Sequence, residues 1–456
     1  MTDPDDHPPD DNPAAHPAGR GSLRSRVAAA RIDLTPLRTS PDFRTLFWAG
    51  TVFYLGSMFG YVAIPYQLFR LTGSNLAVGA MGAVQLLPLV VFGLYGGALA
   101  DRVDRKKMLL ATGAAQTVLV SALLANALTP HPQVWVLYVV GALMSAASSL
   151  QRPSREALIP RVVKHDELPA AVAVSSIGMQ IGMLVGPALG GLVIAQWGPA
   201  VAFGIETAGL GIATLMLLRL RRYPLLRSDP AEEPATVTAI VTGVRYAVGR
   251  RDLLGTYVID MVGMFMAMPI VLFPAFATDV LGTPALLGLL YSAEAVGSFI
   301  ATLTSGWTSR VHHHGRAVTL AAMCWGAAIG LAGLMPSPWL AIVFLAIGGG
   351  ADMISGIFRG VIWHQTIPDE MRGRLAGIEM LSYSIGPLGG QLRSGLVADL
   401  TSVRTAIVSG GALCVLGVAG TAGLLREFWH YDNRTDPYAV AQRRLRADQD
   451  ARPASG

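Results

Sequence analysis

Residues 76–107 read LAVGAMGAVQLLPLVVFGLYGGALADRVDRKK, an apolar run of 25 residues that ends in a short charged segment. The hydrocarbon core of a bilayer is about 30 Å thick and needs roughly 20 apolar helical residues to cross it. The run therefore predicts a membrane-spanning helix. The whole chain supports this, because 52% of its 456 residues are hydrophobic and only 14% are charged, against about 25% charged in a soluble domain. We expect an integral membrane protein.

Apolar runs of similar length recur along the whole chain. They lie at 45–69, 76–100, 108–128, 134–150, 168–195, 199–218, 253–278, 285–308, 317–335, 338–358, 375–398 and 403–425. The strands of a membrane barrel would need only about ten residues of alternating polarity. These longer, continuous runs therefore predict an all-α fold with twelve membrane-spanning helices.

The runs fall into two groups of six, and this grouping divides the chain into five predicted segments. These are a disordered N-terminal tail at 1–41, an N-terminal half at 42–218, a linker at 219–252, a C-terminal half at 253–425 and a C-terminal tail at 426–456. Within the linker, five apolar residues recur at helical spacing, namely Val237, Ile240, Val241, Val244 and Val248. They predict an amphipathic helix, either on the inner membrane surface or packed against the bundle.

Lysine and arginine are distributed unequally about the predicted runs. Of 35 such residues, only Arg70 and Arg404 fall at the proposed outer loops and only Arg393 falls within a run, which leaves 32 on the other side. Cytoplasmic loops carry an excess of these residues. The distribution predicts that both termini lie in the cytoplasm. It also explains the net charge of +5 without a nucleic-acid partner.

The two halves echo one another at a nearly constant offset. Arg102 recurs as Arg310, 208 residues later, and Gly79 recurs as Gly288, 209 residues later. Two related six-helix halves are typical of secondary transporters, whose substrate site lies between the repeats. The repeat therefore favours a transporter.

After the second run the chain carries Gly97, three further residues, Asp101-Arg102 and then basic residues around Arg105. A tight turn with a cytoplasmic positive cluster is the simple structural interpretation. The pattern also resembles the cytoplasmic loop signature of the major facilitator superfamily, although Asp104 replaces the usual second glycine. This resemblance implies a transporter whose inner gate comprises Gly97, Asp101, Arg102 and Arg105.

The fifth run contains a small-residue face with a proline, made of Gly182, Gly186, Pro187, Gly190 and Gly191. Such a face allows close helix packing, and proline removes one backbone hydrogen bond and can bend the helix. Ordinary packing would account for the pattern. It also resembles the motif found mainly in proton-linked exporters of the superfamily, which implies antiport rather than sugar uptake.

Two cytoplasmic segments narrow the resemblance. Residues 152–160 read RPSREALIP and residues 365–374 read QTIPDEMRGR. Both resemble the branch of the superfamily that contains enterobactin and macrolide exporters, and the resemblance extends from about residue 42 to residue 425. It implies export of a siderophore or an amphipathic drug and leaves the choice between them open.

Charged side chains inside the predicted spans are candidates for coupling. They are Glu206, Asp260, Glu294, Asp352, Glu379 and Arg393. Each costs about 2.5–3.5 kcal/mol at a helix centre, so most must face the bundle interior. Asp260 and Asp352 lie level, roughly 10 Å deep at 1.5 Å per residue. The resemblance to the superfamily implies that their spans, the seventh and tenth, line the central cavity, so we expect this pair to couple protons, with Glu294 as a third candidate. The alternative is that one of them is ion-paired, for instance Asp352 with Arg359.

An amphipathic substrate needs an apolar cavity with a few polar groups. Tyr54, Tyr61 and Gln85 in the first two runs are candidates by residue type. Arg393, toward the outer end of the eleventh run, either attracts an anionic substrate such as a catecholate or pairs across the halves.

Other protein classes are disfavoured by what the sequence lacks. The only lysines are Lys106, Lys107 and Lys164, and none follows a glycine, so the chain has no Gly-Lys-Ser/Thr phosphate loop of an ATP-driven pump. Neither Gly-x-Ser-x-Gly nor His-Glu-x-x-His is present, which disfavours a hydrolase. The adjacent histidines 312–314 are too close in sequence to converge on one metal ion.

We therefore expect a transporter rather than an enzyme, with no cofactor, no metal and no nucleic-acid partner. The expected partners are a small-molecule substrate, protons and the lipid bilayer, and the expected state is a monomer. The function predicted is proton-coupled export by alternating access, across the plasma membrane of a bacterium. An importer or a lipid flippase of the same fold is the alternative.

Overall fold

The computed structural model describes residues 33–223 and 236–450. Within these ranges it leaves undescribed the side chains of 94–102, 236–241, 446–450 and parts of 369–381. The described backbone contains helices and no strand. The predicted all-α fold is therefore confirmed.

The first half consists of six long and two short helices. They are α2 (Thr35–Thr39), α3 (Pro41–Thr72), α4 (Asn75–Arg102), α5 (Arg105–Leu128), α6 (Val134–Glu156), α7 (Ile159–Val162), α8 (Leu168–Trp197) and α9 (Pro199–Leu218). We call the end of the bundle that holds residues 73–75 the outer end and the opposite end the inner end, following the predicted orientation.

The second half and its flanking segments contain the remaining helices. They are α10 (Thr236–Val248), α11 (Arg251–Ala267), η1 (Ile270–Leu272), α12 (Phe273–Ala275), η2 (Phe276–Val280), η3 (Pro284–Leu286), α13 (Leu287–Leu303), η4 (Ser305–Arg310), α14 (His314–Leu334), α15 (Pro338–Thr366), α16 (Asp369–Leu400), α17 (Val403–Leu424), α18 (Arg426–Trp429) and α19 (Pro437–Asp450).

Helix ends follow local capping chemistry. The Oγ of Ser40 accepts a hydrogen bond from the Phe43 amide at 3.1 Å and so caps α3. At its other end, Gly73 adopts a φ of 64°, which ends the helix in the left-handed conformation that glycine tolerates. Asp104, which replaces the second glycine of the loop signature, accepts from the Lys106 amide at 2.9 Å and caps α5.

The predicted seventh span is not one continuous helix. The helix α11 ends at Ala267, and the chain continues through the short turns η1, α12 and η2. Pro269 and Pro274 lie in this stretch, and each lacks the amide hydrogen that a regular helix would use. The sequence contained both prolines, but the length of the apolar run concealed the break.

Eleven helical stretches of the described residues are long and apolar enough to cross a membrane. They correspond to eleven of the twelve predicted runs. The remaining run lies in α16, which has 32 residues but carries charged residues, among them Glu379 and Arg393. Its length is sufficient for a span, so the helices are consistent with twelve.

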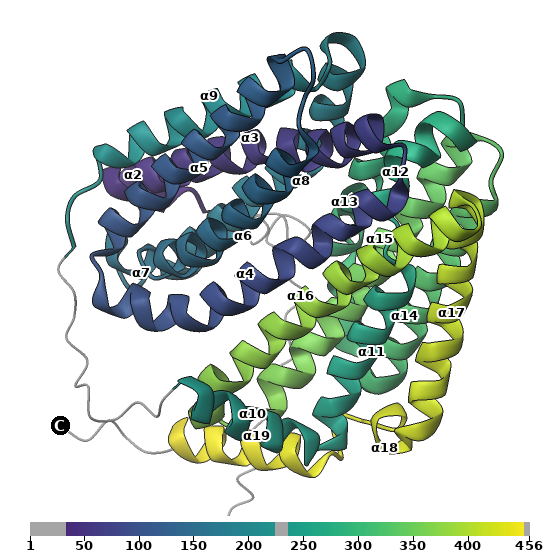
Figure 1. The fold of residues 1–456 in the computed structure, drawn as a ribbon. Helices are drawn as coiled ribbons and strands as arrows, with labels where there is room; N and C mark the ends of the chain where they lie inside the picture. Colours follow the sequence, from purple (N-terminus) through teal and green to yellow (C-terminus); the bar gives the residue numbers. More distant parts are fainter. Residues whose placement is uncertain (1–32, 224–235, 451–456) are drawn as a thin grey trace, which may run out of the picture.

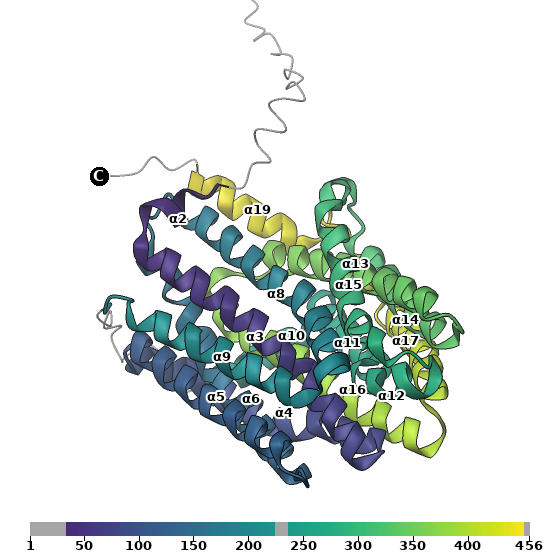
Figure 2. The ribbon, with the colours of Figure 1, turned by 90° about the horizontal axis from the view of Figure 1, so that it is seen from above.

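Two groups of helices face each other in the molecule. Figure 1 shows α3 to α9 as one group and α11 to α17 as the other, with α4 beside α16 where they meet. In Figure 2 the second contact between the groups, α8 with α13, lies near the middle of the molecule. These two helix pairs join the halves.

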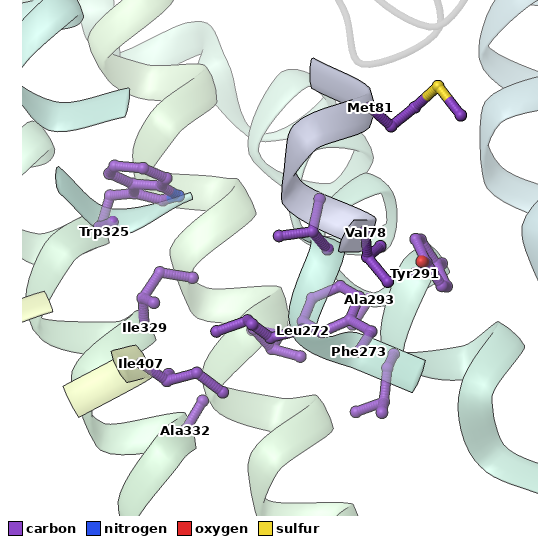
Figure 3. Packing of buried hydrophobic residues seen from close by; sticks show 14 of the residues in the cluster. Val78, Met81, Leu272, Phe273, Tyr291, Ala293, Trp325, Ile329, Ala332 and Ile407 are labelled. Carbon is purple, nitrogen blue, oxygen red and sulfur yellow. The ribbon is translucent and has the colours of Figure 1, made fainter. Parts of the chain in front are cut away.

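The largest apolar core crosses from one half to the other. Val78 and Met81 of α4 belong to the same buried cluster as Leu272, Phe273 and Tyr291 of the second half. Figure 3 shows Val78 near these side chains of the second half, whereas Met81 points away from them. The rings of Phe273 and Tyr291 meet edge to face at 5.1 Å. Because Val78 and Met81 lie near the start of α4, the core joins the halves at the outer end.

The inner end of the second half carries a cap formed by α10, α18 and α19. Arg250 forms an ion pair with Asp252 at the start of α11 and lies 3.6 Å from the ring centre of Tyr438 in α19. Phe428 of α18 is fully buried. A Cβ on Gly315 would lie 1.7 Å from the Phe428 carbonyl oxygen, so this position accepts only glycine.

Candidate functional site

A charged cluster lies inside the second half, between α11, α15 and α16. Asp260 and Arg359 form an ion pair, and each side chain is only 5% exposed. The Oγ of Ser382 donates a hydrogen bond to Asp260 at 3.3 Å. Asp352 Oδ1 lies 4.0 Å from Nη2 of Arg359, and its side chain is 38% exposed. Arg359 thus pairs with Asp260 directly and with Asp352 at the limit of an ion pair.

The third predicted acid, Glu294, lies next to this cluster on α13. A Cβ on Gly349 would lie 2.5 Å from the Cα of Glu294, which means that α13 and α15 approach closely one turn away from Asp352. Asp352 acts electrostatically on Glu294. The Oε1 of Glu294 is buried without a hydrogen-bond partner among the described residues. We call Asp260, Glu294, Asp352 and Arg359 the Arg359 cluster.

The first half contains a cavity of about 560 Å³. Its walls come from α3, α5, α6, α8 and α9, and they include Gly50, Phe53, Tyr54, Met58, Gln116, Met144, Ser148, Arg152, Arg155, Met179 and Met183. Of the predicted substrate residues, only Tyr54 lines it. The Cζ of Arg155 lies 5.0 Å from the centre of the Tyr54 ring. Sequence reasoning did not single out Arg155, because an arginine at an inner helix end looks like part of the topology signal.

The remaining predicted substrate residues lie elsewhere. Arg393 donates to the carbonyl oxygen of Met266 at 2.7 Å, within the second half. The ring of Tyr61 lies 5.5 Å from that of Tyr291, across the two halves. Gln85 is partly buried on α4, and its carbonyl oxygen accepts from Ser145. The structure does not bring these residues together in one cavity.

The glycine face predicted on α8 packs in two directions. Built on Gly182, Gly186 and Gly190, Cβ atoms would lie 3.0, 2.4 and 3.3 Å from atoms of Tyr54, Met58 and Phe59 on α3. On Gly191, a Cβ would lie 2.2 Å from the backbone nitrogen of Gly288 on α13. Three glycines therefore hold α8 against its own half, and Gly191 holds it against the other half.

At the outer end, α16 caps the N-terminus of α4 across the two halves. The carboxylate of Asp399 accepts hydrogen bonds from the amides of Asn75 and Leu76 at 2.8 and 3.1 Å, from the Asn75 side chain and from the Ser74 hydroxyl. A negative charge at a helix N-terminus is stabilised by the unpaired amides there. This outer latch was not predicted, because Asp399 lies just beyond the predicted eleventh span.

Replacing Asp399 with alanine should loosen the outer latch. Hydrogen bonds to a charged group contribute about 1.5–3 kcal/mol, so we expect the population open at the outer end to rise roughly tenfold or more. Val78, which is buried at this contact, reports the change when it is replaced by cysteine in a background lacking Cys324 and Cys414. Labelling by a membrane-impermeant maleimide should accelerate with Asp399→Ala and not with Asp279→Ala, an exposed outer acid. Equal rates in both variants would contradict the latch.

The predicted inner gate is described only in part. The side chains of Gly97, Asp101 and Arg102 lie outside the described residues. Arg105 donates to the carbonyl oxygen of Ala157 at 2.8 Å and so connects α5 to the end of α6. The gate assignment therefore stays a prediction.

The run of histidines does not form a metal centre in the part of the chain that the structure describes, where no group of three or more His, Cys, Asp or Glu side chains could hold an ion. The Nδ1 of His313 lies 3.5 Å from Asp432, and Nε2 of His314 lies 3.0 Å from the carbonyl oxygen of Val311. These histidines join the inner cap to η4 and α14.

Comparison with known proteins shows the family to which the chain is similar. The family described as transmembrane secretion effector matches residues 32–443. The enterobactin exporter EntS of Escherichia coli strain HS is 30% identical over 388 residues, which cover 85% of this chain and 92% of the exporter. The same exporter of Escherichia fergusonii matches with the same figures.

Solved structures of distant sequence share the fold. The nucleoside transporter NupG has a TM-score of 0.65 at 15% identity, over 85% of this chain and 98% of its own. A bacterial homologue of the human lysosomal transporter Spinster, in an inward-facing and unoccupied conformation, has a TM-score of 0.62 at 15% identity, over 89% and 97%. The chain belongs to the transmembrane secretion effector family of the major facilitator superfamily and is a multi-pass membrane transporter rather than an enzyme.

Proposed function

We propose that the protein exports a small amphipathic molecule, a siderophore or a drug, from the cytoplasm in exchange for protons. The similarity to enterobactin exporters supports export of a siderophore-like compound. In this proposal both termini are cytoplasmic, the halves 42–218 and 253–425 move against each other about the linker 219–252, and one chain suffices for transport.

The observation that carries proton coupling is the composition of the Arg359 cluster. Asp260 and Asp352 both lie within ion-pair distance of Arg359, and Glu294 is the third acid of the cluster, with its Oε1 buried and unpaired among the described residues. Among these four groups, full ionisation would leave two negative charges uncompensated inside the membrane. Such burial is costly, and a bound proton removes part of that cost. The cluster therefore suits a site that takes up and releases protons during transport.

The competition of Asp260 and Asp352 for Arg359 also suits a transport cycle with two states. In the state described, Arg359 is paired with Asp260 and lies 4.0 Å from Asp352. A proton on Asp260 would free Arg359 to pair with Asp352, and loss of that proton would restore the first pairing. Because the two acids belong to different helices, α11 and α15, the exchange would shift these helices against each other.

The positions of the contacts between the halves support alternating access. The contacts of α8 with α13 and of α4 with Asp399 lie toward the outer end, whereas the cavity lies beside the inner half of α3. A molecule from the cytoplasm would enter such a cavity, and opening of the outer contacts would release it outside.

The proposal is tested with inverted vesicles that hold the purified protein and are acidic inside. A panel of iron-free siderophores and amphipathic drugs is added, and a pH-sensitive dye reports proton release from the lumen. Antiport predicts release with at least one compound and accumulation of that compound in the lumen. Protein that is folded and inserted but moves no proton with any compound would count against antiport for the panel. Exit of preloaded compound would favour import, and movement of a labelled lipid would favour a flippase.

A further inference from the structure

We propose that the cavity of the first half binds an organic anion with an apolar body, and that Arg155 holds the negative group. That this ligand is the transported substrate rests on the proposed export function. The proposal narrows the substrate class from amphipathic molecules in general to amphipathic anions. The binding itself is testable without transport.

Arg155 brings a positive charge into the cavity without forming an ion pair among the described residues. The side chain is partly buried at the inner end of α6 and lines the cavity wall. No carboxylate in the described part of the chain lies within ion-pair distance of it, and its close contact is the ring of Tyr54, 5.0 Å away. Contact with a ring compensates a cation less than a paired anion does.

The other two charged residues of the cavity wall form an ion pair of their own. Arg152 and Glu156 also line the cavity, but they pair with each other at 3.0 Å and are largely exposed. Among the residues that line the cavity, two arginines and one glutamate leave one positive charge. A cationic ligand would be repelled here, whereas an anion would gain a charged partner in a region of low dielectric.

The backbone is shaped to receive this guanidinium. A Cβ on Gly50 of α3 would lie 1.5 Å from Nη2 of Arg155. Glycine therefore leaves the space that the guanidinium occupies, and any side chain at this position would displace it. The charged head therefore lies against the backbone of α3 at the cavity wall.

The rest of the cavity suits the apolar part of such a ligand. Phe53, Met58, Met144, Met179 and Met183 contribute to its walls, and methionine and aromatic side chains adapt to irregular apolar shapes. Its volume of about 560 Å³ falls within the usual range for small-molecule sites, roughly 300–1,000 Å³. One cation on an otherwise mostly apolar wall is the arrangement that an amphipathic anion requires.

A matched pair of fluorescent probes tests the proposal. Dansylglycine carries a carboxylate, and dansylglycinamide has the same body without the charge. Binding of each to the full chain in nanodiscs of phosphatidylcholine is measured by fluorescence titration against empty nanodiscs. We expect the anion to bind about tenfold more tightly than the amide, as one charge-assisted contact allows.

Two independent variants locate the contact. Arg155→Gln should weaken dansylglycine about tenfold and leave dansylglycinamide unchanged. Gly50→Ala should have the same effect, because it displaces the guanidinium while retaining the charge. Arg44→Gln is the control, since Arg44 lies exposed near the inner end of α3 and does not line the cavity. Thermal unfolding of each variant in the nanodisc identifies any that is not folded.

The result that would overturn the proposal is equal affinity for the two probes, or unchanged dansylglycine binding in both folded variants. The anion could also be a lipid headgroup, so the titration is repeated with phosphatidylglycerol in the nanodisc. Unchanged binding supports a soluble anion, and loss of dansylglycine binding assigns the site to lipid and overturns the proposal. Failure of proton exchange in vesicles with the charge preference intact would count against proton antiport for the panel and leave this site standing.

Discussion

Substrate-driven proton release is expected to fall to the level of empty vesicles when Asp260 is replaced by asparagine. Asparagine binds no proton at this position, and it leaves Arg359 without the acid that it pairs with. Breaking a buried ion pair from one side costs about 3–5 kcal/mol, so the variant should also unfold at a lower temperature. The measurement is the pH-dye assay in inverted vesicles, with thermal unfolding of the purified protein beside it.

Two further variants separate coupling from stability. Asp260→Asn combined with Arg359→Gln removes both charges, and we expect it to regain stability without regaining proton release. Glu206→Gln removes a carboxyl group that is equally buried but belongs to α9 of the first half, and we expect normal coupling. Normal proton release by Asp260→Asn would move the coupling role to Asp352 or Glu294.

Replacing Gly191 with valine should prevent closure of the outer contact between the halves. The added Cβ would lie 2.2 Å from the Gly288 nitrogen, and Gly288 itself stands close to the Pro187 carbonyl oxygen, so neither backbone can yield easily. Overpacking costs about 1–3 kcal/mol, which corresponds to a shift of about 5- to 150-fold between two states. We expect the halves to separate at the outer end and transport to decline accordingly.

Spin labels at Leu128 and Leu334 measure this separation, because both side chains are exposed at the outer ends of their helices. The distance distribution should move to larger values with Gly191→Val. Gly420→Val is the matched control, since a Cβ at Gly420 meets nothing within 4 Å. An unchanged distribution in a folded Gly191→Val protein would show that closure does not depend on this glycine.

The helices and the acidic residues of the candidate site could be predicted from the sequence. Which of these acids pairs with Arg359 could not. Asp260 and Asp352 could be placed at similar depth because helical rise is regular. Their relation to Arg359 depends on how α11, α15 and α16 rotate about their axes, which apolar runs on all faces of a helix leave undetermined. The expected alternative, an ion pair of one acid such as Asp352 with Arg359, is found at 4.0 Å, but the closer pair of Arg359 with Asp260 could not be read from the sequence.

The same limit applies to the small residues and to the charges at helix ends. The glycines of α8 predicted close packing, and it is found, but the division between α3 and α13 follows from tertiary contacts alone. Arg155 and Asp399 were overlooked because charged residues are common at the ends of membrane helices, where they determine topology and contact water. A partner far away in the chain, Gly50 or the start of α4, is what distinguishes them.

The inner cap attaches additional helices to the inner end of the second half. Arg250 donates to the Tyr246 hydroxyl of α10 at 2.9 Å and to the Thr366 carbonyl oxygen of α15 at 2.8 Å, and it contacts the ring of Tyr438 in α19, so these three helices are connected through one side chain. A probe attached to α19 therefore travels in the reference frame of the second half. Rotation of the first half relative to the second can therefore be followed with two labels, one on the first half and one on α19 as the fixed reference.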